Sequence, residues 1–144
     1  MASRYVSAFI AAVGSTTLPQ GSLYSAAAIG AALIEVGTWS NSATQKKLQL
    51  RRLTSVGTAV SQGKGNYDND GLAASCTAYT THTVAPTLGD PLHGFSTPGA
   101  GGTGIMWGFH ERPVEIPIGT TNGIGILPLT ALGGTDVVLV WDEG

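Results

Sequence analysis

The sequence predicts an all-β chain folded as an antiparallel β-sandwich. Segments rich in Val, Ile, Leu, Thr and aromatic residues recur along the 144 residues, separated by clusters of Gly, Pro, Asn, Ser and Asp. No window shows a sustained helical period flanked by capping residues. Residues 112–129 hold two short apolar stretches joined by Gly119–Gly123, with prolines at the margins where a missing backbone N–H is tolerated. The length suits one domain, so we expect a single domain over residues 1–144.

Apolar segments bounded by turn residues mark the predicted strands. In chain order they are Tyr5–Val13, Ser25–Trp39, Gln45–Val56, Cys76–Pro86, Thr103–Phe109, Val114–Ile118, Ile124–Leu129 and Asp136–Trp141. A helix is most plausible in the Ala-rich run Tyr24–Leu33, but Gly30 and the apolar continuation favour one long, bent strand. Residues 1–14 are either the first strand or an arm that extends onto a neighbouring molecule, and the sequence favours the strand.

Alternation within the strands predicts which faces are buried. In Lys47–Arg51 polar and basic side chains alternate with two leucines, which predicts a half-exposed strand with a basic outer face. Arg52 beside Leu53 breaks the alternation and predicts a bulge. Asp136–Trp141 is apolar on both faces, so we expect it at the centre of a sheet or covered by a neighbouring copy.

Three connections follow from turn residues and spacing. Ser40–Thr44 is short and polar, and predicts a hairpin between an apolar strand and the basic strand. Gln62–Gly71 and Leu88–Gly102 are too long for hairpin turns. Long loops in a compact sandwich usually contact partners or are partly disordered in isolation, and the sequence leaves both alternatives open for these two.

The chain is poor in charge. Charged residues make up 11% of it, against about 25% in average soluble proteins, and the net charge is −2. A weakly hydrated surface suits a protein that stays bound to other proteins, although an ordinary neutral β-domain would have the same composition. The net charge argues against a strongly basic nucleic-acid binder and gives no reason to expect attraction to an acidic membrane.

Charge is also segregated along the sequence. Five of the seven basic residues lie between Lys46 and Lys64, whereas Asp136, Asp142 and Glu143 gather at the C-terminal end. Two such patches could dock between copies or onto a larger partner. They could equally be two solvated strand ends.

Few residues suggest chemistry. The single cysteine, Cys76, is expected to be a small buried apolar residue, the alternative being a nucleophile paired with His82. The histidines His82, His93 and His110 lack the close spacing of zinc sites. We therefore expect no catalytic residue, no cofactor-binding residue, no metal site and no enzymatic activity.

Several segments together resemble a known class of proteins. They are the N-terminal strand, the Ala- and Val-rich strand after it, the turn Trp39–Ser42, the basic stretch Lys46–Leu53, the block Glu115–Pro128 and the closing run that ends at Trp141. Over most of the chain this pattern resembles small structural proteins of tailed-phage virions. It is most similar to jelly-roll decoration, or cement, proteins that bind the outer surface of an icosahedral capsid.

The resemblance implies a jelly-roll-like sandwich that binds the lattice of the major capsid protein and itself, commonly as a homotrimer. It would be made in the cytoplasm of a bacterial host, carried on the capsid surface and bound to neither nucleic acid nor membrane. Cement proteins need a broad interface of low charge and no catalytic cleft. The residues expected at a capsid or subunit interface are Arg4, Tyr5, Phe9, Lys46, Lys47, Arg51, Arg52 and Trp141.

Other trimeric jelly rolls share this strand pattern, including tumour-necrosis-factor-type ligand domains and the receptor-binding heads of phage fibres. The leading alternative is therefore a receptor- or glycan-binding head of a phage fibre or tail tip. It predicts exposed aromatic residues in the long loops, for which Tyr67, His93 and Phe95 are the candidates. A small hydrolase or cupin-like enzyme is a third hypothesis, and the absence of a metal-ligand cluster in the sequence is the main objection to it.

Overall fold

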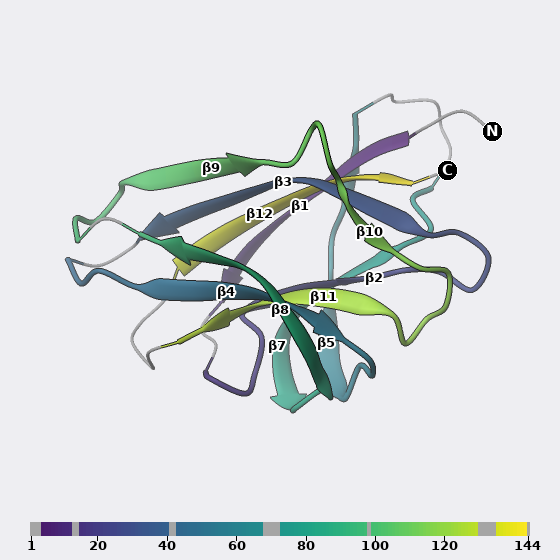
Figure 1. Cartoon of the computed structure of the whole chain (residues 1–144), viewed down its shortest axis with the longest axis horizontal. Coiled ribbons are helices and arrows are strands. Elements are labelled where there is room, and N and C mark those ends of the chain that lie inside the picture. The colour runs from purple at the N-terminus through teal and green to yellow at the C-terminus, as the bar shows by residue number, and fades with distance from the viewer. Residues whose placement is uncertain are drawn as a thin grey trace.

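The structure is a computed structural model that describes residues 4–12, 15–40, 43–67, 73–97, 99–129 and 135–143. These residues form an antiparallel β-sandwich, which confirms the predicted fold class (Figure 1). The strands are β1 (Arg4–Ala12), β2 (Gly21–Tyr24), β3 (Ala31–Ser40), β4 (Lys47–Leu53), β5 (Thr58–Gln62), β6 (Gly65–Asn66), β7 (Thr77–Val84), β8 (Leu88–Ser96), β9 (Gly104–Gly108), β10 (Val114–Ile116), β11 (Gly123–Pro128) and β12 (Thr135–Glu143). Among the described residues there is no helix of the length and hydropathy needed to span a membrane.

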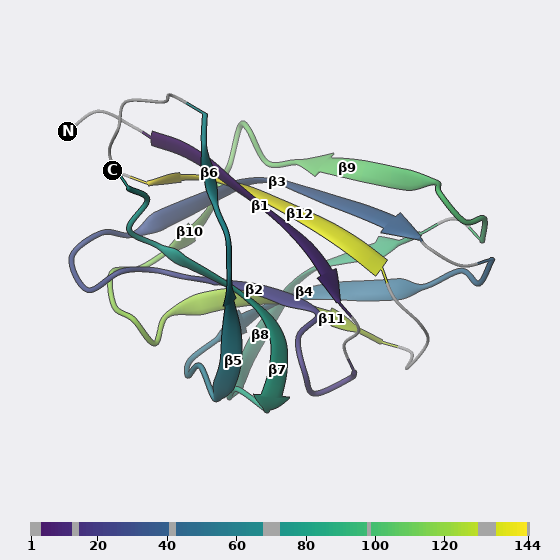
Figure 2. The ribbon, with the colours of Figure 1, turned by 180° about the vertical axis from the view of Figure 1, so that it is seen from behind.

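The strand order is that of a jelly roll. Sheet A has the order β10-β3-β12-β1-β6, with β9 also paired to β3, and sheet B has the order β5-β7-β2-β11-β4-β8. The first four strands pair with the last strands in reverse order: β1 with β12, β2 with β11, β3 with β10 and β9, and β4 with β8. A long hairpin rolled into two sheets gives this pattern. Strands β5, β6 and β7 widen both sheets beside β1 and β2 (Figure 2).

The core lies between the sheets and follows the two-residue period of the strands. On β1 the side chains of Val6, Ala8 and Ile10 are buried, whereas Tyr5, before Val6, and Phe9, before Ile10, are exposed. Strand β12 lies between β1 and β3, as its two apolar faces predicted. The largest fully buried side chains are Trp141, Tyr24, Ile10, Leu23, Leu33, Leu48, Leu50, Leu53, Ile124, Ile126, Leu127 and Leu139.

The long, bent strand predicted at Ser25–Trp39 is wrong over residues 25–30, whereas Ala31–Trp39 is a strand, part of β3. Strand β2 belongs to sheet B and β3 to sheet A, and residues 25–30 cross between them. The crossing is fixed by Ser25, whose backbone N–H donates to Asn122 O and whose hydroxyl donates to Ile116 O. The apolar pattern of a segment does not distinguish a strand that continues in one sheet from a segment that crosses to the other sheet. The crossing could therefore not be predicted from the sequence pattern.

Two predicted connections are also wrong. Strands β3 and β4 lie in different sheets, so Ser40–Thr44 does not close a hairpin. Most of the loop predicted at Leu88–Gly102 is strand β8, an edge strand paired with β4. Its two glycines and Pro91 hide the alternation, and an edge position tolerates a residue without a backbone N–H. In the loop predicted at Gln62–Gly71, residues 65–66 form β6, and residues 68–72 lie outside the described residues.

Strand β4 itself matches its prediction. Leu48 and Leu50 are buried while Lys47 is exposed. The pairing with β8 shifts between Arg51 and Leu53, so the irregularity predicted beside Arg52 is present.

A buried carboxylate fixes the end of β12. Glu143 is 2% exposed, and its Oε1 accepts the backbone N–H of Ser75 at 2.5 Å. Its Oε2 accepts the backbone N–H of Cys76 at 2.9 Å and the indole N–H of Trp141 at 3.1 Å. Burial acts to raise the pKa of Glu143, but these hydrogen bonds outweigh it and hold the pKa below the ordinary value of 4.5. The carboxylate thus ties β12 to the start of β7.

Replacing Glu143 by Gln is expected to reduce the free energy of unfolding at pH 7 by about 1–3 kcal/mol, because an amide cannot accept all three N–H groups as strongly. The folded pKa is lowered, so this stabilisation is complete above 4.5 and is lost as the pH falls through the folded pKa. Urea denaturation should therefore show that wild type has a larger free energy of unfolding than Glu143→Gln at pH 7, and that this difference becomes smaller at acidic pH. Glu111→Gln, at an exposed position, is the control. Equal stability of wild type and Glu143→Gln at pH 7 would contradict the assignment.

Candidate functional site

The two sheets differ in what covers their outer faces. On sheet B, loops of the chain itself cover part of the face: the Tyr24 hydroxyl donates to Ser55 O at 2.7 Å, and Pro19 packs against Gly125. Tyr24 is buried as a result. Sheet B still exposes Val60, Val84 and Leu92 on its strands β5, β7 and β8. On sheet A, the strand register brings exposed large apolar side chains together on the outer face. The outer face of sheet A is therefore the candidate functional site.

Strand register aligns apolar residues across this face. Phe9 lies opposite Val138, Val138 opposite Gly37, and Gly37 opposite Met106. Phe9 is 54% and Met106 47% exposed, and Val138 between them is half-buried. Trp39 is two residues beyond Gly37 on the same face of β3 and is also half-buried. We call Phe9, Trp39, Met106 and Val138 the apolar row.

Glycines keep the apolar row flat. A Cβ atom added at Gly37 or Gly104 would overlap the indole ring of Trp39. The ring therefore lies on the backbone of β3 and β9, in space that only glycine leaves open. Met106 borders the same space, since its sulfur would lie 2.5 Å from a Cβ atom at Gly37. The result is a broad apolar surface, of the kind found at the centre of protein–protein interfaces.

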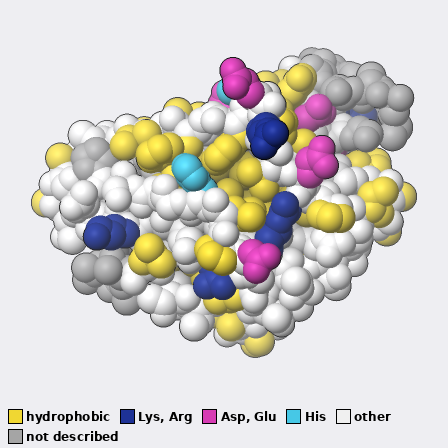
Figure 3. Space-filling view, viewed as in Figure 1, with side chains coloured by type: hydrophobic (Ala, Val, Ile, Leu, Met, Phe, Trp, Pro, Cys, Tyr) yellow, Lys and Arg dark blue, Asp and Glu magenta, His cyan; other side chains and the backbone are white. Residues whose placement is uncertain are grey.

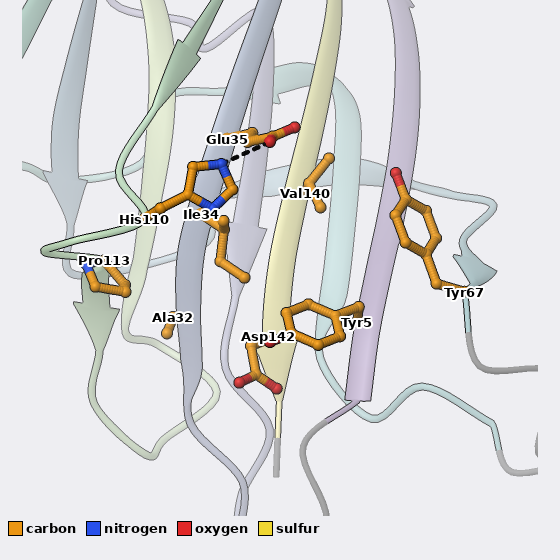
Figure 4. A pocket seen from close by; sticks show the side chains of 9 residues that line it. All are labelled: Tyr5, Ala32, Ile34, Glu35, Tyr67, His110, Pro113, Val140 and Asp142. Atoms are coloured by element: carbon orange, nitrogen blue, oxygen red, sulfur yellow. Dashed lines mark hydrogen bonds and ion pairs between the residues drawn. The ribbon is translucent and has the colours of Figure 1, made fainter.

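A groove of about 410 Å³ lies on the same sheet, beside β6 and the turn after β9 (Figure 4). Its lining residues are Tyr5, Ala32, Ile34, Glu35, Tyr67, His110, Pro113, Val140 and Asp142. Figure 4 shows Tyr5 and Tyr67 on one side, His110 and Pro113 on the other, and the aliphatic side chains between them. We call this set the groove.

The groove is lined by the carboxylates of Glu35 and Asp142 and by the imidazole of His110. Glu35 Oε1 lies 2.7 Å from His110 Nε2, and both side chains are partly exposed. Asp142 Oδ1 accepts the backbone N–H of Arg4 at 3.0 Å. Two carboxylates at the rim of an aliphatic floor give the groove a negative potential, which neighbouring apolar walls strengthen.

The residues expected at an interface do not share one surface. Tyr5 and Phe9 lie on the outer face of sheet A, and Arg4 is half-buried with its guanidinium donating to Ala73 O at 3.1 Å. The four basic residues of this set lie on or beside β4, in sheet B, and of these only Lys47 is exposed. Trp141 has no exposed surface and belongs to the core, so its place among the interface residues is wrong.

The other basic residues are engaged within the chain. Arg51 donates from Nη2 to Gly89 O at 2.6 Å, and Arg52 donates to Glu115 O. Lys46 is buried, and burial lowers the pKa of its ammonium group while the charge of Asp136 acts in the opposite direction. The basic residues on and beside β4 therefore do not form a single exposed basic surface.

Aromatic residues on β8, on β9 and directly after β9 close one edge of the sandwich. The rings of His93, Phe95, Trp107 and Phe109 lie with centroids 5.1–5.7 Å apart. Figure 3 shows hydrophobic side chains gathered over this edge with a histidine among them. Phe95 is buried, so its expected exposure is wrong. His93 is exposed, and its ring packs against Phe95, Trp107 and Phe109. Tyr67, the third aromatic candidate, lines the groove.

Cys76 and His82 have different partners. The thiol of Cys76 is buried between the sheets, and burial, followed by the nearby Glu143 carboxylate, raises its pKa to about 12. His82 Nε2 lies 2.7 Å from the Ser22 hydroxyl, and burial lowers the pKa of its imidazole. Within the part of the chain that the structure describes, no cluster of three or more His, Cys, Asp or Glu side chains could hold a metal ion.

Sequence reasoning missed several residues of this face. Met106, Val138 and Glu35 were not candidates, because nothing local distinguishes an apolar residue facing outward from one facing the core. A signal for Glu35 was present: it is the first charged residue after Arg4 and interrupts an apolar strand. Register across four strands, which no single segment encodes, brings the others together.

Comparisons with known proteins add little to this geometry. No protein-family model matches the chain, and no curated protein matches it. Among solved structures, it is similar to the virus-like particle of the extra small virus of the giant freshwater prawn Macrobrachium rosenbergii, with 12% sequence identity. That match covers 99% of this chain and 80% of the viral chain at a TM-score of 0.24, a likeness too weak to carry an argument about function.

The raised pKa and burial of Cys76 predict an inert thiol. In the native protein at pH 8, we expect Ellman's reagent to modify Cys76 far more slowly than in urea-unfolded protein, where the thiol regains its ordinary pKa. The measurement is the time course of absorbance with and without urea. Equally fast labelling in both states would contradict the buried position of the thiol.

The flat position of Trp39 predicts that Gly37→Ala is costly. The new methyl group would displace the indole ring, and we expect a loss of about 1–3 kcal/mol in the free energy of unfolding together with a changed near-ultraviolet circular dichroism spectrum. Gly63→Ala, where a Cβ atom meets nothing within 4 Å, is the matched control. Equal stability of the two variants would show that the ring does not rest on Gly37.

Proposed function

We propose that this protein is a non-enzymatic structural protein of a virus particle, a jelly-roll decoration protein. In this proposal it binds the outer surface of an icosahedral phage capsid as a homotrimer, with the major capsid protein and its own copies as partners and without nucleic acid or membrane. It would be made in the bacterial cytoplasm. The observation that carries the proposal is the uncovered apolar row on sheet A.

The apolar row favours association because exposed apolar surface is unfavourable in water. Monomeric proteins seldom expose large contiguous apolar patches, and such patches commonly mark interaction sites. Fully burying an exposed large apolar side chain contributes about 1.5–3 kcal/mol, and Phe9 and Met106, each about half exposed, would contribute about half of that. A flat row spanning four strands can meet another flat surface with several side chains at once.

Two observations support a capsid as the binding partner: the sequence resemblance to cement proteins and the low content of charged residues. A protein that binds the assembled lattice but not its free subunits stabilises the shell by mass action. Such a role needs a wide contact of low charge, which the 11% charged content and the apolar row offer. It requires no bond-making chemistry of the protein.

One observation favours the alternative of a glycan-binding head. Tyr67 is 62% exposed and lies beside Tyr5 in the groove, where tyrosine rings and carboxylates together could hold a sugar. A receptor-binding head and a cement protein differ in what they bind. Capsid binding therefore separates the two functions.

The test is to mix the purified protein with expanded capsids prepared without it and to sediment them. The proposal expects saturable, stoichiometric pelleting and a homo-oligomer by light scattering. The double variant Phe9→Glu, Met106→Glu should weaken capsid binding and self-association by tenfold or more each, because a carboxylate is strongly disfavoured in an apolar contact. Val60→Glu, an equally exposed apolar position on β5 of sheet B, is the control. A monomer that leaves all protein in the supernatant would overturn the proposal.

A further inference from the structure

The groove combines features that recognise one kind of chemical group. Its floor is aliphatic, formed by Ala32, Ile34 and Val140. Tyrosine rings stand on one side, and the carboxylates of Glu35 and Asp142 lie at its ends (Figure 4). An aliphatic floor fits a hydrocarbon stem, and rings together with carboxylates fit a cation at the end of that stem.

The charges around the groove support a cationic occupant. Among the residues that the structure describes, its lining holds two carboxylates, one histidine and no lysine or arginine. Arg4, adjacent to Tyr5, directs Nη1 to Ala73 O, with Glu143 Oε1 at 4.0 Å. Glu111 and Arg112, which follow His110 in the sequence, are exposed and carry opposite charges. An incoming positive charge therefore meets complementary charge in the groove.

Arginine suits this arrangement better than lysine. Its planar guanidinium stacks on aromatic rings and forms paired hydrogen bonds with a carboxylate, and it is less strongly hydrated than an ammonium group. Tyr5 and Tyr67, 42% and 62% exposed, supply the ring surfaces. Asp142 and Glu35 supply acceptors from two different strands.

We propose that the groove binds an arginine side chain presented by a partner protein. The stem lies over Ala32, Ile34 and Val140, and the guanidinium lies between the tyrosine rings and the carboxylate of Asp142, which is opposite Tyr5 in the strand register. The carboxylate of Glu35 lies at the other end of the stem. This inference rests on the proposed function only for where the partner comes from, a neighbouring protein of the shell. The groove and the apolar row consist of different residues, so each can be tested alone.

The test is a nuclear magnetic resonance titration of the full chain with the blocked peptide acetyl-Gly-Arg-Gly-amide. The matched probe is the same peptide with citrulline, which keeps the shape and removes the charge. We expect saturable shifts of the groove residues with the arginine peptide, binding at least tenfold weaker for the citrulline peptide, and a loss of affinity as salt is added.

Variants identify the site. Glu35→Gln with Asp142→Asn should weaken binding of the arginine peptide by tenfold or more, while Asp142→Asn retains an oxygen that can accept the Arg4 N–H. Tyr67→Ala, at an exposed position, removes one ring without touching the core and should weaken binding several-fold. Glu115→Gln, an exposed acid on β10 outside the groove lining, is the control and should bind as wild type does.

Three results would overturn the inference: equal binding of the citrulline peptide, shifts that fall outside the groove, or a neutral oligosaccharide that shifts the groove residues when the arginine peptide does not. The last result would assign the groove to a glycan. The Phe9→Glu, Met106→Glu variant separates this test from that of the proposed function. It should lose self-association and still bind the arginine peptide.

Discussion

The central position of β12 is the constraint on which the rest of the structure depends. The strand is hydrogen-bonded to β1 on one side and to β3 on the other, and its side chains alternate between the core and the outside. Val137, Leu139 and Trp141 fill the core. Because the strand is apolar on both faces, the same pairing places Val138 and Val140 on the outer face of sheet A. A buried strand at the centre thus makes an apolar outer face unavoidable.

The neighbours of β12 extend that face in two different ways. At one end, glycines on β3 and β9 let Trp39 lie flat, and the apolar row forms a surface without depth. At the other end, Tyr67 beyond β6 and His110 after β9 rise on either side of the sheet, and a groove results. A flat apolar surface and a lined groove serve different kinds of contact, one broad and one directed at a single side chain.

The hydrogen bonds of Glu143 connect the fold to this site. The carboxylate holds the last residues of β12 against the start of β7, and the residue before it, Asp142, lies in the groove. Buried polar groups that are fully bonded stabilise one arrangement over others. The groove therefore depends on a buried contact that no surface residue reveals.

The sequence by itself determined the fold class, the half-exposed basic strand β4, the irregularity beside Arg52 and the central place of β12. Each of these follows from the two-residue period or from turn residues, which are local properties of a strand. The tertiary structure alone decided that the predicted strand Ser25–Trp39 begins only at Ala31, after a crossing from sheet B to sheet A, that Leu88–Ser96 is an edge strand, and that Trp141 is in the core. It alone also assembled the apolar row and the groove. The physical reason is that sheet membership and register depend on hydrogen bonds between segments far apart in the chain, and a shift of one residue exchanges the inner and outer faces.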